Sequence, residues 1–391
     1  MNRQHCARPG GLAVHLRFAI GSLLVGVLSS ACASAPGHTE ARFYPELPEQ
    51  PRIQYLTTIS SQEDVRPTSA FRRYVVGTPQ QPGLQRPWAI GHDRGRIYVV
   101  DKGLNQVVII DLDERRFDRL VTGGQAALVE PSGIFIANDG FKYISDAGRG
   151  QVLEFDTENR YTRAFGSQEQ FRPLDVVVRG GKLYVCDVRD EEIEILDRES
   201  GEVVGRIGHQ GDGPGAFRFP THLALGSDGD LFVTDLMNFR VQRFDAEGNY
   251  VRDIGEWGDF PGAMPRPKGI AVDRKGNLYA ADAAFEMIQV FDTETARPLL
   301  PFGKFGTGPG GSYLPSGVHI DYENMDRFSR YLAPGFTPEY LIYVANQAGP
   351  DKLNVYAFGH WEDPNPGQSP EPVPVPAPQP VPGQGEDAPD H

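Results

Sequence analysis

Residues 267–292 run PKGIAVDRKGNLYAADAAFEMIQVFD and contain three short apolar runs. A proline opens the first run, and Gly, Asn and Asp residues bound the others. Runs this short, separated by turn-forming residues, are typical of β-strands joined by tight turns. The stretch therefore predicts three consecutive antiparallel strands.

The same unit occurs six times, at intervals of roughly 45 residues. Each copy opens with a proline, at Pro87, Pro131, Pro173, Pro220, Pro267 and Pro315. The second run of each copy ends in an anchor residue, at Asp101, Asp146, Asp187, Asp235, Asp282 and Asn346. A fourth apolar run follows in five copies, and four short strands per repeat are typical of one β-propeller blade.

The fifth copy, with PKGIAVD, GNLYAAD and IQVFD, resembles the NHL repeat, and the resemblance covers residues 83–361. It implies an all-β fold, a six-bladed β-propeller of four-stranded blades. The sixth copy lacks a fourth run and carries an insertion around Asn324 to Glu339. Residues 52–59 (RIQYLTTI) alternate like a strand, so we expect this N-terminal strand to complete the last blade and remove an exposed sheet edge.

The N-terminal segment has the layout of a secretory signal peptide over residues 1–31, with an apolar core from Phe18 to Leu28. Cys32 follows small residues, as in the lipobox of bacterial lipoproteins, which it resembles. We therefore predict that Cys32 is lipidated and holds the protein at a bacterial cell envelope, at the outer membrane or periplasmic face. Because Ser29 stands where such boxes usually have Leu, cleavage without lipidation is the alternative.

Two polar segments flank the repeats. Residues 32–50 are predicted to form a tether, residues 51–361 the propeller, and residues 362–391 a proline-rich disordered tail. In one hypothesis the tail, from Pro370 to Pro382, docks into a groove of another protein.

Composition and motifs exclude several functions. The formal net charge is −14 and no cluster of Lys and Arg occurs, so nucleic-acid binding is not expected. The anchor carboxylates recur once per blade, which favours a turn-capping role over catalysis. The glycine-rich stretches, such as residues 208–217, lack the Gly-Lys-Ser/Thr ending of a phosphate-binding loop. No catalytic residue and no cofactor are predicted.

A metal centre is not predicted either. The zinc-dependent lyase that completes peptide amidation has a related fold and carries His directly after the proline that opens a blade. The matching positions here are Trp88, Ser132, Leu174, Thr221, Lys268 and Ser316. His222 and His319 fall elsewhere in the predicted channel strands, and we interpret them as structural.

One face of the predicted propeller carries candidate binding residues. Cations follow the anchors or the opening prolines, and Trp88 adds aromatic surface; the candidates are Trp88, Lys102, Arg149, Arg189, Arg240 and Lys268. They suit an anionic ligand or partner, unless each cation pairs with a neighbouring acid. The preferred hypothesis is a non-catalytic envelope protein that presents this face to a protein partner or ligand. The alternative is a hydrolase or lyase that acts on a small ester, lactone or sugar with a divalent metal in the channel.

Overall fold

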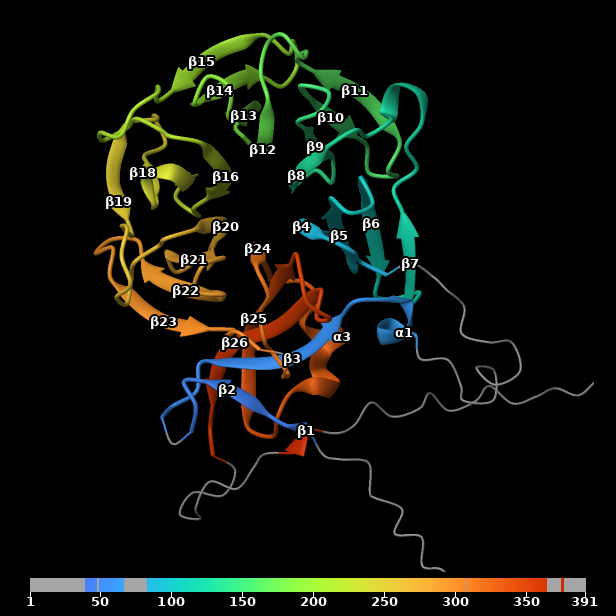
Figure 1. Ribbon diagram of the computed structural model, residues 1–391. Coiled ribbons are helices and arrows are strands. Elements are labelled where there is room, and N and C mark those ends of the chain that lie inside the picture. The colour runs from blue at the N-terminus through green and yellow to red at the C-terminus, as the bar shows by residue number, and fades with distance from the viewer. Residues whose placement is uncertain (1–38, 48, 67–82, 307, 364–373, 376–391) are drawn as a thin grey trace, which may run out of the picture. The chain divides into compact units, whose positions relative to one another are not determined.

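The computed structural model describes residues 39–47, 49–66, 83–306, 308–363 and 374–375, and these are almost entirely β. Six antiparallel sheets surround a central axis (Figure 1). One strand of each sheet lies innermost: β4 (Pro87–Asp93), β8 (Pro131–Ile136), β12 (Pro173–Arg179), β16 (Pro220–Leu225), β20 (Pro267–Val272) and β24 (Pro315–Asp321). We number the blades 1 to 6 after these strands. Each inner strand contacts the next, and β24 contacts β4, which closes the ring.

The other strands follow outward in each blade. The second strands are β5 (Arg96–Asp101), β9 (Lys142–Asp146), β13 (Lys182–Asp187), β17 (Leu231–Asp235), β21 (Asn277–Asp282) and β25 (Phe336–Asn346). The third strands are β6 (Gln106–Asp111), β10 (Gln151–Phe155), β14 (Glu192–Asp197), β18 (Arg240–Phe244), β22 (Met287–Asp292) and β26 (Leu353–Trp361). The fourth strands of blades 1 to 5 are β7 (Arg116–Arg119), β11 (Tyr161–Phe165), β15 (Val203–Ile207), β19 (Tyr250–Ile254) and β23 (Pro298–Phe302). The six-bladed propeller expected from the repeats is confirmed.

The anchor residues hold the blades' turns, as the sequence predicts. Asp101 accepts hydrogen bonds from the backbone N–H groups of Gly103, at 2.8 Å, and of Gln85, at 2.6 Å. The first bond caps the turn after β5, and the second fixes the loop that precedes Pro87. A buried carboxylate that takes several backbone donors is a structural element, because those donors would otherwise be left without partners.

The sixth blade is completed from the N-terminus. Strand β3 (Ile53–Ile59) pairs antiparallel with β26, with Ile59 opposite Leu353 and Ile53 opposite Phe358. The expected closure by an N-terminal strand is therefore confirmed. The folded part begins earlier than residue 51, however, because β2 (Arg42–Tyr44), inside the expected tether, adds a fifth strand. It does so because Phe43 and Tyr44 are both buried, against Trp361 and Phe302 respectively.

The insertion of the sixth repeat forms α3 (Met325–Phe328), η3 (Ser329–Tyr331) and the first part of the long β25. Gln54, fully buried in β3, donates to the Tyr331 carbonyl at 2.8 Å and accepts from Ala333 N–H at 3.0 Å. The N-terminal strand thus also holds the insertion.

The remaining elements are short: α1 (Gln62–Val65), η1 (Gly124–Ala126), η2 (Leu236–Asn238), and β1 (Thr39–Glu40) paired with β27 (Pro374–Val375). Within the ranges that the structure describes, no helix has the length and apolarity to cross a bilayer. The predicted signal peptide, Cys32 and most of the proline-rich tail lie outside those ranges.

Candidate functional site

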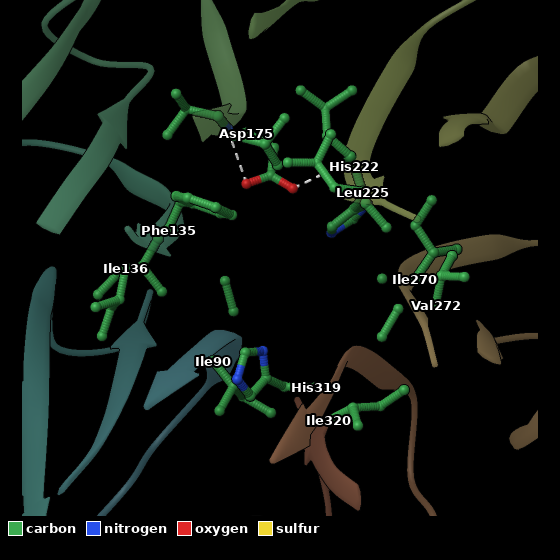
Figure 2. Close-up of a pocket in the computed structure, with 18 of the residues that line it drawn as sticks. Ile90, Phe135, Ile136, Asp175, His222, Leu225, Ile270, Val272, His319 and Ile320 are labelled. Carbon is green, nitrogen blue, oxygen red and sulfur yellow. Dashed lines mark hydrogen bonds between the residues drawn. The ribbon is translucent and has the colours of Figure 1, made fainter. Parts of the chain in front are cut away.

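A cavity of about 610 Å³ lies on the central axis and is lined by the inner strands of all six blades (Figure 2). Its lining includes Asn138, Gly180 and Ser227, which follow the ends of β8, β12 and β16. The cavity therefore reaches the face at which the inner strands end. We call this the distal face, and we call the face with the six opening prolines the proline face. The volume is that of a small-molecule pocket.

The cavity wall combines aliphatic side chains with polar ones. Figure 2 shows the side chains of Ile90, Ile136, Leu225, Val272 and Ile320 around the opening. They belong to five different inner strands, because only the innermost strand of each blade reaches the axis. A wall of this kind favours apolar ligand surface and leaves orientation to the few polar groups in the lining.

Asp175, in β12, is the one acidic side chain in the lining of this cavity. Its Oδ1 accepts from Val176 N–H at 2.9 Å, and its Oδ2 accepts from Leu223 N–H of blade 4 at 3.0 Å. The residue is partly exposed and faces the cavity. Burial raises the pKa of this carboxyl to about 7, although both backbone bonds act in the opposite direction.

His222, the residue before Leu223, is 5% exposed and also lines the cavity. Its Nδ1 lies 3.0 Å from the hydroxyl of Thr221, whereas its Nε2 is buried without a hydrogen-bond partner among the described residues. Burial, together with the nearby Lys268 and Lys102, holds the pKa of this imidazole well below its usual range. The imidazole is therefore neutral, with one free ring nitrogen.

Trp88 bounds the cavity toward the proline face. It is the lining residue nearest the start of its strand, and its ring stacks on His222 with centroids 5.9 Å apart. Blades 1 and 4 lie on opposite sides of the ring, so this contact spans the channel (Figure 1). On the same indole lie the ammonium groups of Lys102 and Lys268, 4.0 and 5.2 Å from the ring centroid.

Among the residues that the structure describes, neither lysine forms an ion pair with an acid. In the described part of the chain, the lysines that form ion pairs are Lys142, Lys275 and Lys304. The pKa of Lys268 is lowered to about 8, chiefly by burial and also by the nearby Arg266 and Lys102. Burial also lowers the pKa of Lys102, although Glu130 opposes the shift. Two partly dehydrated cations thus lie on one indole ring.

The three predicted arginines do not join this group. Each binds oxygens of its own blade or of the adjoining loop: Arg149 donates to the Gln125 and Ala127 carbonyls, Arg189 to the Glu169 carbonyl, and Arg240 to Asp235 and Asp253. For these residues the interpretation as structural cations fits the geometry. Trp88, Lys102 and Lys268 are the predicted residues that the fold brings together.

Three further cations, which the sequence analysis overlooked, stand on the proline face. Arg86, Arg172 and Arg266 are exposed, and each directly precedes the opening proline of blade 1, 3 or 5. The repeated Arg-Pro pair was the signal that could have revealed them. Glu130 occupies the same position in blade 2 and lies 3.6 Å from Arg172. Three arginines thus stand on this face near the axis, one of them beside an acid.

At the distal end, His92 and His319 form a ring–ring contact. His92 Nδ1 lies 2.7 Å from His319 Nε2, and His92 Nε2 lies 3.3 Å from Asp321 Oδ1. The pKa of His319 is lowered to about 3, chiefly by burial and also by His92, while Asp321 opposes the shift. The two rings thus line the cavity as a hydrogen-bonded pair next to a carboxylate.

The residues of the channel do not fit a zinc centre. Ser132 and Ser316, at positions where the related lyase carries His, are buried and donate to the carbonyls of Pro173 and Pro87 in the next blades. In the described ranges, no group of three or more His, Cys, Asp or Glu side chains is arranged to hold a metal ion. The serine hydroxyls serve the packing of adjacent blades.

The molecule is thus a six-bladed β-propeller with a ligand-sized axial cavity and a basic proline face. No family model matches the chain, so the likeness to NHL repeats stays a prediction. The probable peptidyl-α-hydroxyglycine α-amidating lyase of Caenorhabditis elegans is 28% identical over 97 residues, which cover 24% of this chain and 28% of that protein. The chain thus matches little more than a quarter of that relative's length.

A solved structure supports the fold. A Bacteroides thetaiotaomicron protein of unknown function aligns with a TM-score of 0.53 at 15% identity, over 79% of this chain and 76% of its own. Virginiamycin B lyase from Staphylococcus aureus aligns with a TM-score of 0.48 at 14% identity, over 70% and 95% of the two chains. At this identity, a likeness indicates architecture alone.

The buried Asp175 makes stability depend on pH. Its pKa is about 7 in the folded chain and 3.8 as a free side chain, so between these values the folded state binds the extra proton. Stability therefore falls as the pH rises through this window. We expect Asp175→Asn, which cannot ionise, to gain stability relative to the parent from pH 5 to pH 8. Thermal melts of both proteins at each pH measure this difference, and parallel curves would contradict it.

Proposed function

We propose that this protein is a non-catalytic binding propeller of the bacterial envelope, which holds an anionic group of a partner or ligand at its proline face. The observation that carries the proposal is the pair of ammonium groups on Trp88 without a carboxylate partner. Partly buried cations are costly unless they are paired. A bound anion would supply the missing partner.

The surrounding charge supports an anionic ligand. Arg86, Arg172 and Arg266 stand around the same end of the axis, whereas the whole chain carries a formal net charge of −14. A local reversal of sign on an acidic protein concentrates and orients negatively charged partners near that surface. The indole of Trp88 adds a flat apolar contact beside the charges, which is typical of binding hot spots.

The envelope location rests on the sequence. A leader over residues 1–31 and a lipobox-like Cys32 support export and attachment through an N-terminal lipid. In this proposal, residues from Cys32 up to β2 connect the anchor to the propeller. The propeller then presents its basic face to a protein or an anionic ligand within the envelope.

An enzymatic function has less support. The name of the Caenorhabditis elegans relative is that of a lyase. The alternative to a binding function is therefore a metal-dependent lyase or hydrolase that acts in the channel. The positions that such a lyase needs for its metal carry Trp88, Ser132, Thr221 and Lys268 among others. The hydroxyls of Ser132 and Thr221 are engaged in hydrogen bonds. Binding at the proline face uses the residues that are actually present.

A short acidic peptide tests the proposal. We expect the mature protein to bind a fluorescein-labelled tetraglutamate at low salt, and the double variant Lys102→Gln, Lys268→Gln to bind it roughly tenfold more weakly or worse, since two charge-assisted contacts are lost. Fluorescence anisotropy measures both affinities. Lys182→Gln with Lys275→Gln, which removes the same charge from the distal face, is the matched control. Equal affinities of the two double variants, or no binding by the parent, would overturn the proposal.

A further inference from the structure

The axial cavity is large for a space without an assigned occupant. At about 610 Å³ it has room for on the order of 20 water molecules, taking about 30 Å³ for each. Ile, Val and Leu side chains form a large part of its wall, beside polar residues such as Asn138, Arg179 and His319, and the aliphatic part gives water few hydrogen bonds. Replacing this water with apolar ligand surface would be favourable.

Two polar groups at the inner end of the cavity have unused hydrogen-bonding capacity. Each oxygen of Asp175 accepts one backbone N–H, and a carboxylate oxygen has two lone pairs. His222 Nε2 has no partner among the described residues although it is buried. A buried unpartnered polar atom in a well-packed protein needs an explanation, and a bound molecule is one.

The two groups lie on neighbouring blades beside one hydrogen bond between those blades. Asp175 Oδ2 binds the N–H of Leu223, the residue that directly follows His222. Both side chains line the same cavity, and Figure 2 shows them on the same side of it. A single head group placed between them would thus contact blade 3 through the carboxylate and blade 4 through the imidazole.

Charge selects the kind of head group. A cation is disfavoured because the ammonium groups of Lys102 and Lys268 lie just behind Trp88 and His222. An anion is disfavoured at this end of the cavity because it would meet the carboxyl group of Asp175, whose own ionisation is already opposed by burial. A hydroxyl or an amide can donate to Asp175. A hydroxyl can also donate to, or accept from, His222 Nε2, whichever tautomer the ring adopts.

We propose that the axial cavity is a binding site for a neutral, mainly aliphatic small molecule whose hydroxyl or amide group is held between Asp175 and His222. The site is separate from the anion-binding face, since Trp88 lies between the two. The aliphatic part of the ligand extends along Val272, Ile320 and Leu225 toward the distal face, which is its route of entry.

A matched series of probes tests the class of ligand. We expect 1-hexanol to bind the mature protein, and hexylamine and hexanoate, which differ in the head group alone, to bind at least about tenfold more weakly because a charge must be buried. Isothermal titration calorimetry measures the three affinities. Equal binding of the three probes, or no heat with 1-hexanol, would overturn the proposal.

Variants test the location. Val272→Phe places an aromatic ring in the cavity and is expected to abolish 1-hexanol binding, whereas Val251→Phe, on the exposed strand β19, is expected to leave it unchanged. Asp175→Asn is expected to weaken binding about tenfold, because one strong acceptor is lost. If Val272→Phe melts early, Leu225→Phe is a second blocking variant.

Binding of tetraglutamate separates this site from the basic face. It is expected to be the same in Val272→Phe as in the parent, so the two proposals can fail independently. Retention of 1-hexanol binding in both blocking variants would show that the alcohol binds elsewhere and would overturn the assignment to the cavity.

Discussion

Deletion of residues 51–60, which removes β3, is expected to unfold the whole ring and not just blade 6. Ile53, Leu56 and Ile59 of this strand are buried, and burial of each such side chain contributes about 1.5–3 kcal/mol. Their sum is comparable to the net stability of a typical domain, about 5–15 kcal/mol. The deletion also leaves the edge of β26 without its partner.

Side-chain bonds add to this dependence. Thr58 donates to Asn354 of β26 at 2.6 Å, and Gln54 holds the insertion through Tyr331 and Ala333. Leu84, at the entry to blade 1, donates its N–H to the Ser60 carbonyl at 2.8 Å. The segment thus joins the last blade to the first. Its loss opens the ring between them, and an open ring exposes apolar blade faces.

Thermal melts followed by circular dichroism measure the effect. We expect the deletion variant to show no cooperative transition at the parent's melting temperature. A chain in which residues 53–59 keep their composition but lose their alternation is the control for length, and it should behave like the deletion. A synthetic peptide of residues 51–60 should restore the transition in a concentration-dependent way. A deletion variant that melts like the parent would refute the closure argument.

The architecture was predictable because each blade is specified locally. Apolar runs, a proline at the start of each inner strand and an acid or amide at each anchor recur within about 45 residues, so one copy explains the next. Even the closing strand β3 could be recognised, since the sixth repeat lacks a fourth run. Strand β2 could not be recognised, because only Phe43 and Tyr44 mark it and their burial depends on partners in blades 5 and 6.

The site was less predictable because it depends on the directions in which side chains point, and the repeat pattern does not encode these directions. Lys102 and Arg149 occupy equivalent turns, yet one lies on Trp88 and the other binds carbonyls of a neighbouring loop. Repeat position thus predicts the face of a residue but not the direction of its side chain. Asp175 reaches the Leu223 N–H, beside His222, only because blades 3 and 4 are adjacent, and the other four copies carry Ala or Gly at the repeat position that Asp175 and His222 occupy.

The substitution Arg243→Met is expected to lower the stability of the ring by about 3 kcal/mol, within the range for breaking a buried ion pair. Arg243, in β18, is 8% exposed and donates to Asp230 of blade 4. It also donates to Glu294 at 2.6 Å and to the Thr293 carbonyl at 3.2 Å, both in the turn between β22 and β23 of blade 5. The substitution therefore breaks a contact between blades and leaves the Asp230 carboxylate buried without a cation.

Urea unfolding of three further variants distinguishes this cause from a general effect of losing an arginine. Arg160→Met removes an exposed arginine whose partners, Asp156 and Glu158, lie in its own turn, so its unfolding midpoint should stay near that of the parent. Asp230→Leu alone should be destabilising, because it leaves Arg243 without its buried partner. The double variant Arg243→Met, Asp230→Leu should be more stable than Arg243→Met, since an apolar pair replaces an orphaned charge. If the double variant is instead the least stable of the set, the penalty comes from lost packing around β18, and the ion pair is not what joins blades 4 and 5.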